Sequence, residues 1–275
     1  MGKFKLILGV CVLAAVSALQ SCNDDDGYSI GDFSWDWATV RTTGSGGYYL
    51  EGDTWGTIEP VATSIPWYKP VDGERVSAFF NPLADMTSQK GVQVKMEGIE
   101  KLLTKKVEVV ANREDSLKFG NDPITIYQGD MWLGGKFLNV VFLQNLPRNE
   151  KHLISLVQDK RTDEGGQVAP PATGTAEATP EPSPVIDQDG YVNLELRYNT
   201  YKDETNYQGW GKVSFSLEDV YPTVVTTADA PAFKGFKVTI HSRQNGEGVV
   251  VKLDLNHPAG VPDAAKEVHT PSSLE

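Results

Sequence analysis

Residues 191–199 have the sequence Tyr-Val-Asn-Leu-Glu-Leu-Arg-Tyr-Asn, in which apolar and polar side chains alternate. Successive side chains of a β-strand point to opposite faces of a sheet. In an ideal strand the apolar members of this stretch share one face, namely Val192, Leu194, Leu196 and Tyr198. The stretch therefore predicts a strand with one face in a hydrophobic core and the other face outside it.

Similar runs occur on both sides of this strand. Together with it they form a series at 124–131, 137–143, 152–158, 191–201, 212–217, 236–242 and 249–255. Seven short strands separated by turn residues favour an antiparallel β-sandwich.

A second series of strand-like runs precedes the first. Its members lie at 33–42, 48–61, 75–80, 92–99 and 107–111. Five short strands in so little sequence suit a small closed barrel of the OB type. The sequence thus predicts an all-β chain, with a small OB-like β-barrel followed by a seven-stranded antiparallel β-sandwich.

Polar and biased segments divide the chain. The polar stretch 112–122 is the predicted junction between a barrel domain at 32–111 and a sandwich domain at 123–256. Within the sandwich, 163–188 is rich in Pro, Ala, Thr and Gly and has no aromatic residue, so we expect a long mobile loop. We also expect a flexible tail at 257–275.

The N-terminus has the pattern of a secretory signal. Two lysines among the first five residues precede an apolar run at 6–19, which is short for a membrane span. The run ends in Leu19-Gln20-Ser21-Cys22, which resembles a bacterial lipobox. This predicts a signal peptide at 1–21, cleavage before Cys22 and lipidation of its sulfur. The alternative is an ordinary cleaved signal or a short signal anchor with a chance cysteine.

The segment 22–31 is a predicted acidic tether, because Asn23 is followed by three aspartates. An acidic run just after a lipidated cysteine also resembles the surface-export signal of lipoproteins of the Bacteroides group. We therefore expect an outer-membrane lipoprotein at the cell surface, with the periplasmic face as the alternative. The membrane is then a partner through the lipid anchor.

Charge and cysteine content exclude several classes of protein. The formal net charge is −12, and it becomes −14 once residues 1–21, with two lysines and no acidic residue, are removed. An acidic chain without a basic stripe repels phosphate backbones, so we expect no nucleic-acid partner. The only cysteines, Cys11 and Cys22, lie at the N-terminus. The mature body therefore has no disulfide and no cysteine-ligated zinc.

Several segments together resemble the NigD-like lipoproteins of the Bacteroides group. They are the Cys-Asn-Asp-Asp-Asp start at 22–26, Trp-Asp-Trp-Ala at 35–38, the pair of runs at 124–132 and 137–142, and the strand at 191–199. The resemblance implies an N-terminal OB-like domain and a C-terminal β-sandwich over about residues 22–255. The family name comes from a bacteriocin-associated locus, and it brings no catalytic residue and no cofactor.

Residues that support chemistry are scattered. The four histidines form no close pair, and no metalloprotease, serine-hydrolase, phosphate-loop or dinucleotide motif is present. Asp187 and Asp189 fit a turn better than a Ca²⁺ loop, which would need further ligands. We therefore expect no metal, no cofactor and no enzyme, although a carboxylate pair defined only in space stays open.

Aromatic residues crowd the first domain, and we expect most of them to pack in its core. The exception is Trp67 and Tyr68, because the flanking Pro66 and Pro70 favour a loop. These two are the predicted binding residues. Asp115-Ser116-Leu117 resembles a short O-glycosylation signal, which makes Ser116 a candidate modification site.

The function predicted from these features is that of a non-catalytic envelope module that binds a protein, glycan or surface partner. The first alternative is an accessory or immunity protein of a bacteriocin system, implied by the family name. The second is an enzyme with an unrecognised carboxylate site.

Overall fold

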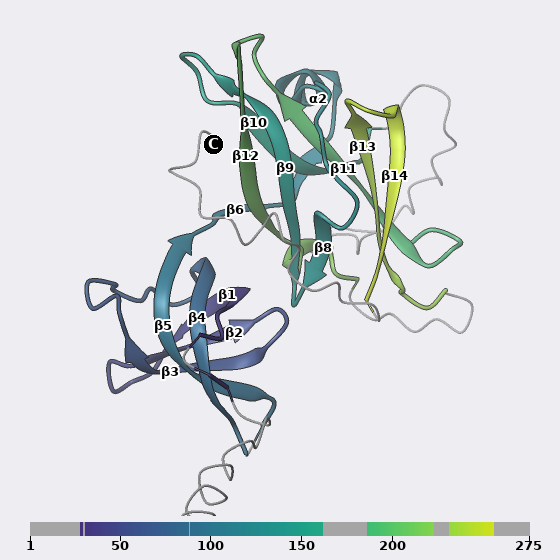
Figure 1. Cartoon of the computed structure of the whole chain (residues 1–275). Helices are drawn as coiled ribbons and strands as arrows, with labels where there is room; N and C mark the ends of the chain where they lie inside the picture. Colours follow the sequence, from purple (N-terminus) through teal and green to yellow (C-terminus); the bar gives the residue numbers. More distant parts are fainter. Residues whose placement is uncertain (1–27, 30, 88, 162–185, 223–230, 256–275) are drawn as a thin grey trace, which may run out of the picture.

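A computed structural model of the chain describes residues 28–29, 31–87, 89–161, 186–222 and 231–255 (Figure 1). The predicted signal peptide, the lipidation site Cys22, most of the tether and of the loop at 163–188, and the tail lie outside these residues. The described chain forms two β domains, a barrel and a sandwich, joined where β5 continues into β6. The predicted all-β class, with a barrel before a sandwich, is confirmed.

Five strands close the barrel. They are β1 (Ser34–Thr42), β2 (Tyr48–Gly52), β3 (Gly56–Thr63), β4 (Arg75–Asp85) and β5 (Gly91–Lys101). Their order is β1-β2-β3-β5-β4, with β3 and β5 parallel and the other pairs antiparallel. This is the five-stranded Greek-key arrangement of an OB-like barrel.

One layer of aligned apolar residues runs across the inside of the barrel. Val40 lies opposite Leu50, Leu50 opposite Ile58, and Ile58 opposite Val92. All four are buried, as expected from the period of two. Their neighbours along each strand therefore point outward, and these outward residues form the surfaces described below.

The sandwich has two sheets. Its further strands are β6 (Leu103–Lys106), β7 (Glu108–Val110), β8 (Met131–Gly134), β9 (Phe137–Pro147), β10 (Leu153–Asp159), β11 (Tyr191–Asn199), β12 (Glu204–Ser216), β13 (Gly235–Ser242) and β14 (Gly246–Asp254). One sheet has the order β14-β13-β11-β10-β7 and the other β6-β12-β9-β8. In β11 the four apolar residues predicted to share a face are all buried, which confirms the alternation from which the fold was inferred.

The boundary between the domains differs from the prediction. The chain leaves the barrel at Leu102, and β6 and β7 already pair with β12 and β10 of the sandwich. The run at 107–111 is therefore no barrel strand, and the fifth barrel strand arises because the run at 48–61 turns at 53–55 into two strands. The segment 112–122 is no linker: it holds the helix α2 (Arg113–Phe119), capped by Asn112 Oδ1 accepting from the Asp115 backbone N–H at 2.9 Å.

The sandwich also differs in detail from an antiparallel seven-stranded one. Nine strands are present among the described residues, and three pairs are parallel: β7 with β10, β11 with β13, and β6 with β12. The predicted strand at 124–131 is not one strand: Ile124 and Thr125 make isolated bridges to Ser242 and Leu143, and Met131 begins β8. A short 3₁₀ helix (Glu218–Val220) follows β12. None of the helices in the described part has the length and apolar character needed to cross a bilayer.

Candidate functional site

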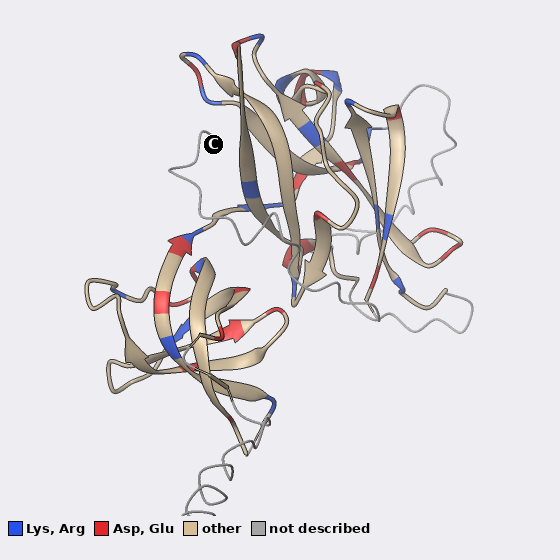
Figure 2. Ribbon diagram, in the orientation of Figure 1, with Lys and Arg blue, Asp and Glu red and all other residues tan. Residues whose placement is uncertain are grey.

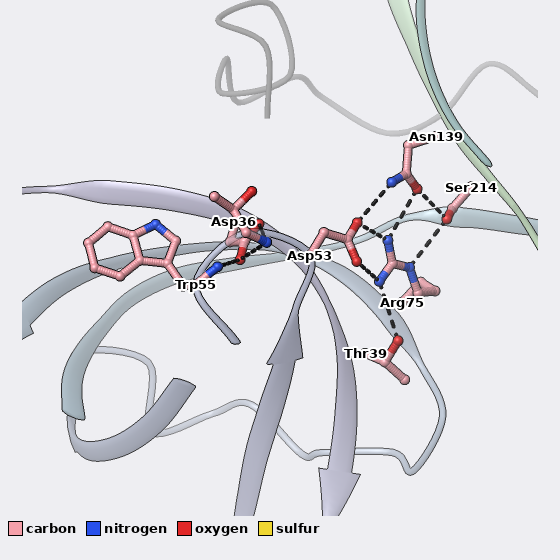
Figure 3. A network of polar contacts seen from close by, with 8 residues as sticks. Asp36, Thr39, Asp53, Trp55, Arg75, Asn139 and Ser214 are labelled. Atoms are coloured by element: carbon pink, nitrogen blue, oxygen red, sulfur yellow. Dashed lines mark hydrogen bonds and ion pairs between the residues drawn. The ribbon is translucent and has the colours of Figure 1, made fainter. Parts of the chain in front are cut away.

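A buried network of polar side chains joins the two domains (Figure 3). Its centre is the ion pair between Arg75, at the start of β4, and Asp53, in the β2–β3 turn. The two side chains are only 1% and 4% exposed. Asn139 of β9 and Ser214 of β12 reach this pair from the outer face of the sandwich sheet. The most buried ion pair of the described chain therefore lies where the barrel meets the sandwich.

Every N–H donor of the Arg75 guanidinium has an acceptor. Nη1 and Nη2 donate to the two Asp53 oxygens at 3.0 and 2.6 Å. The remaining N–H groups donate to Oγ1 of Thr39, Oδ1 of Asn139 and Oγ of Ser214. A buried ion pair is stable only when such bonds satisfy the donors and acceptors that remain. The network is thus complete, and it is built from both domains.

An apolar cluster also joins the two domains. Trp37 of β1 lies edge-on against Trp132 of β8, with ring centroids 4.8 Å apart. Leu102 and Val141 are buried in the same cluster, and Trp210 packs against it. Lys212 of β12 also pairs with Glu100 of β5 at 3.1 Å. Trp37 therefore faces the sandwich and not the barrel core, contrary to the expectation for most of the first-domain aromatics.

One carboxyl next to the network is strongly perturbed. Burial raises the pKa of Asp36 to about 7, against the opposing effect of the Trp55 and Thr54 backbone N–H groups. The negative charge of Asp53 raises this pKa further. A perturbed carboxyl is a candidate acid or base only where substrate reaches it. Asp36 is fully buried, so its side chain is closed to a substrate from solvent.

An open groove lies on the outside of the barrel. Its floor consists of outward residues of β2 and β3, and its wall is the β4–β5 loop. The lining residues are Tyr49, Glu51, Thr57, Glu59, Met86 and Gln89, and the groove has a volume of ≈ 360 Å³. Backbone hydrogen bonds fix the wall, from Met86 N to Gly91 O at 2.9 Å and from Thr57 N to Lys90 O at 3.2 Å.

The groove is acidic and only partly neutralised. Glu51 accepts from Arg41 Nε at 2.7 Å and Glu59 accepts from Gln93 Nε2 at 3.1 Å, each through Oε2. Among the described residues, nothing donates a hydrogen bond to the other oxygen of either carboxylate. The groove therefore holds two carboxylates with an unused oxygen, the exposed Glu51 and the half-buried Glu59.

A second depression, of ≈ 150 Å³, lies on the outer face of the five-stranded sheet. Its charged residues are already paired within the protein. Arg197 binds Glu195, and His241 Nδ1 lies 2.5 Å from the Asn121 carbonyl oxygen. This hollow offers less volume and fewer open polar groups than the groove on the barrel.

Trp67 and Tyr68 are the two predicted binding residues, and only Trp67 is exposed. Trp67 is 67% exposed in the β3–β4 loop. Tyr68 is half-buried: its ring lies against Tyr48 at 5.6 Å and its hydroxyl donates to Glu74 at 3.3 Å. Burial raises the pKa of the Tyr68 phenol. Tyr68 therefore belongs partly to the barrel core, and only Trp67 has the exposure expected of both.

The other candidate positions are explained by local structure. Ser116 is half-buried on α2, in a helix and not in the expected polar linker. His152 is buried between the Tyr198 hydroxyl and the Asp203 carbonyl. Asp187 and Asp189 form the predicted turn before β11, and the Lys237 ammonium lies 2.6 and 2.8 Å from them. No group of metal-ligating side chains occurs in the described part of the chain.

Sequence comparison identifies the second domain. The profile of the NigD-like C-terminal beta sandwich domain matches residues 106–169 and 178–253, about half of the chain. The chain belongs to the NigD-like family. The match begins at 106, which agrees with β6 and β7 lying in the sandwich. No protein with a curated description matches the chain.

Crystal structures of proteins from Bacteroides and Parabacteroides species share the fold. A protein of unknown function from Bacteroides vulgatus is 24% identical, with a TM-score of 0.60 over 80% of this chain and 89% of that one. A putative toxin-related protein from Parabacteroides distasonis is 25% identical, with a TM-score of 0.57 over 81% and 94%. A NigD-like immunity protein from Bacteroides caccae is 16% identical, with a TM-score of 0.50 over 82% and 94%. The two-domain architecture therefore extends over nearly the whole of each of these NigD-like or related chains.

Proposed function

We propose that this NigD-like protein is a non-catalytic envelope lipoprotein that presents its barrel as an interaction module. The observation that carries the proposal is the joint arrangement of the two surfaces of the barrel. One surface is fixed to the sandwich by the Arg75–Asp53 network and the Trp37–Trp132 contact, and another is open at the groove. A rigid support with an exposed recess suits binding, since little conformational freedom is lost when a partner docks.

The described residues give less support to catalysis than to binding. The carboxyl with the near-neutral pKa, Asp36, is fully buried, whereas the carboxylates that line the groove are the exposed Glu51 and the half-buried Glu59. Among the residues that Figure 2 colours, basic and acidic positions are scattered over both domains, without the continuous basic stripe that binding of a nucleic acid requires.

An accessory or immunity role in a bacteriocin system is the second candidate. Membership of the NigD-like family favours it, and related structures include a toxin-related and an immunity protein by name. In that case the partner of the open barrel surface is a bacteriocin or its receptor. Both candidates place the protein in the envelope, anchored through Cys22 in the outer membrane, with the cell surface favoured over the periplasmic face.

The anchor and the display are tested together. Cells that express the wild type or Cys22→Ser are labelled with a radioactive fatty acid and then treated, intact, with protease. We expect label on the wild type alone and digestion of the wild type from outside. Fatty-acid label on the variant contradicts the anchor. If the lipidated protein resists protease in intact cells but is digested after lysis, it lies at the periplasmic face. Crosslinking of the lipidated protein in intact envelopes then tests for a specific partner, and its absence contradicts the interaction role.

A further inference from the structure

We propose that the groove on β2 and β3 is a glycan-binding site whose ligand is a short segment of a neutral oligosaccharide. The assignment rests on the proposed interaction role and names its ligand class. Five features of the groove carry it: place, size, an aromatic floor, open acceptors and charge.

The place of the groove is the first argument. OB-like barrels that bind oligonucleotides or oligosaccharides hold them on strands 2 and 3, beside the loops between strands 1 and 2 and between strands 4 and 5. Here the floor is made by β2 and β3 and the wall by Met86 and Gln89 of the β4–β5 loop. The volume of ≈ 360 Å³ lies at the lower end of the range for ligand pockets, which suits a short segment of a chain.

The charge of the groove decides between the two ligand classes. Glu51 and Glu59 are the charged residues that line the groove, and the net charge of the whole chain is negative. Phosphate is repelled by such a surface. Sugar hydroxyl groups are hydrogen-bond donors, and each carboxylate has an oxygen that no described residue uses. The same carboxylates that exclude an oligonucleotide therefore favour a neutral sugar.

The aromatic and flexible residues complete the site. The half-buried Tyr49 offers a flat apolar face with a polar edge, which suits the apolar face of a sugar ring. Met86 also lines the groove, from the β4–β5 loop, and a flexible thioether adapts to irregular shapes. Thr57 and Gln89 add a hydroxyl and an amide, each both donor and acceptor, as hydroxyl-rich ligands require.

The described ends of the β4–β5 loop lie close to β3. Gly91 has no side chain, and a Cβ there would lie 2.4 Å from the Thr57 carbonyl oxygen and 2.8 Å from the Met86 sulfur. Only glycine therefore allows Met86 and Thr57 to lie this close to the start of β5.

The test uses the full mature chain with Cys22→Ser, so that the protein is free of lipid. Its migration is measured in native gels that contain starch, galactomannan, arabinoxylan or xyloglucan, and oligosaccharides from the polysaccharide that retards it most are titrated by calorimetry. We expect retardation by at least one of the four and no binding of a dT12 oligonucleotide. Tyr49→Ala should weaken binding about tenfold or more, and the isosteric Glu59→Gln about fivefold.

Matched controls lie in the sandwich. Tyr207→Ala removes a tyrosine that is 77% exposed, and Glu218→Gln removes an exposed glutamate, so both should leave the affinity unchanged. The proposal is overturned if none of the four polysaccharides retards the protein, if binding survives Tyr49→Ala, or if only an octalysine peptide binds. Envelope crosslinking separates the failure of this proposal from failure of the proposed function. A specific crosslinked partner without glycan binding refutes the groove assignment alone. The absence of both a crosslinked partner and glycan binding refutes both proposals.

Discussion

Two arginine–carboxylate pairs lie on the outside of the same barrel, and they differ in almost every physical respect. Arg75 and Asp53 are 1% and 4% exposed, and three further side chains from two domains bind them. Arg41 and Glu51 are 39% and 49% exposed and form a single hydrogen-bonded pair across neighbouring strands. The same chemistry therefore occurs once at the interface between the domains and once at the edge of the groove.

Burial decides what each pair can do. An exposed pair contributes about 0–1 kcal/mol to stability, because water and salt screen it. The net contribution of a buried pair to stability is small or even unfavourable, because both charges lose their hydration. Removal of one partner is nevertheless strongly destabilising, because it leaves an uncompensated buried charge. The comparison teaches that the buried pair holds the domains in one arrangement, whereas the exposed pair is free to exchange partners with a ligand.

Breaking the buried pair should have the largest effect. Asp53→Ala leaves the Arg75 guanidinium buried without its carboxylate, so the free energy of unfolding should fall by about 3–5 kcal/mol. Urea unfolding measures the change. Glu51→Ala is the matched control in the exposed pair and should cost no more than about 1 kcal/mol. Equal effects of the two variants would contradict the comparison.

The next effect concerns pH. The folded protein holds the Asp36 proton up to about pH 7, whereas the unfolded chain releases it near the ordinary value of 3.8. Between these values the folded state binds more protons, so this group lowers the free energy of unfolding as pH rises, by up to about 1.4 kcal/mol per pH unit. Asp36→Asn should remove that slope.

The measurement is the free energy of unfolding of wild type and Asp36→Asn at several pH values between 4 and 8. The stability of the wild type relative to the variant should decline through this window and level off above pH 7. A constant difference across the window would show that the Asp36 carboxyl ionises at an ordinary pH in the folded protein.

A smaller change should disturb the buried pair from the side of the sandwich. A Cβ at Gly134 would lie 2.1 Å from Asp53 Oδ2, and Asp53 is held by Arg75 and Asn139. Gly134→Ala should therefore displace Asp53 and cost about 1–3 kcal/mol, as overpacking does. The matched control is Gly44→Ala, where a Cβ meets no atom within 4 Å and the φ is not positive, so this variant should leave the free energy of unfolding nearly unchanged.

The smallest effects sharpen the distinction between exposed and half-buried aromatics. Trp67→Ala should change the free energy of unfolding by within about 0.5 kcal/mol, since the side chain lies in solvent. Tyr68→Ala should cost between about 1 and 2 kcal/mol, because the ring packs against Tyr48. Thermal unfolding of the two single variants measures the difference, and the reverse order would place Trp67 in the core.

Local patterns of the sequence were enough to predict part of this structure. The alternation in β11 predicted its buried face because the two-residue period of a strand needs no knowledge of its partners. The prediction treats 48–61 as one strand, although Gly52, Asp53 and Gly56 are turn residues that divide it into β2 and β3. The run at 107–111, which belongs to the sandwich, is therefore wrongly counted as the fifth barrel strand.

The sites depend on contacts that local patterns do not contain. Arg75 lies 22 residues from Asp53, 64 from Asn139 and 139 from Ser214, and nothing near it marks it as buried. The groove had a weak signal, since Tyr49 and Glu51 flank Leu50 as Thr57 and Glu59 flank Ile58. That alternation gives two outward pairs on one hairpin, but only the fold shows that the β4–β5 loop lies beside them.

The buried Arg75–Asp53 pair should make barrel and sandwich unfold as one cooperative body. Differential scanning calorimetry of the mature chain with Cys22→Ser, alone and with Asp53→Ala, tests this claim. We expect one transition, with equal calorimetric and van't Hoff enthalpies, in the parent, and two separate transitions in the variant as the domains uncouple. Two transitions in the parent, or a single transition at an unchanged midpoint in the variant, would contradict the claim.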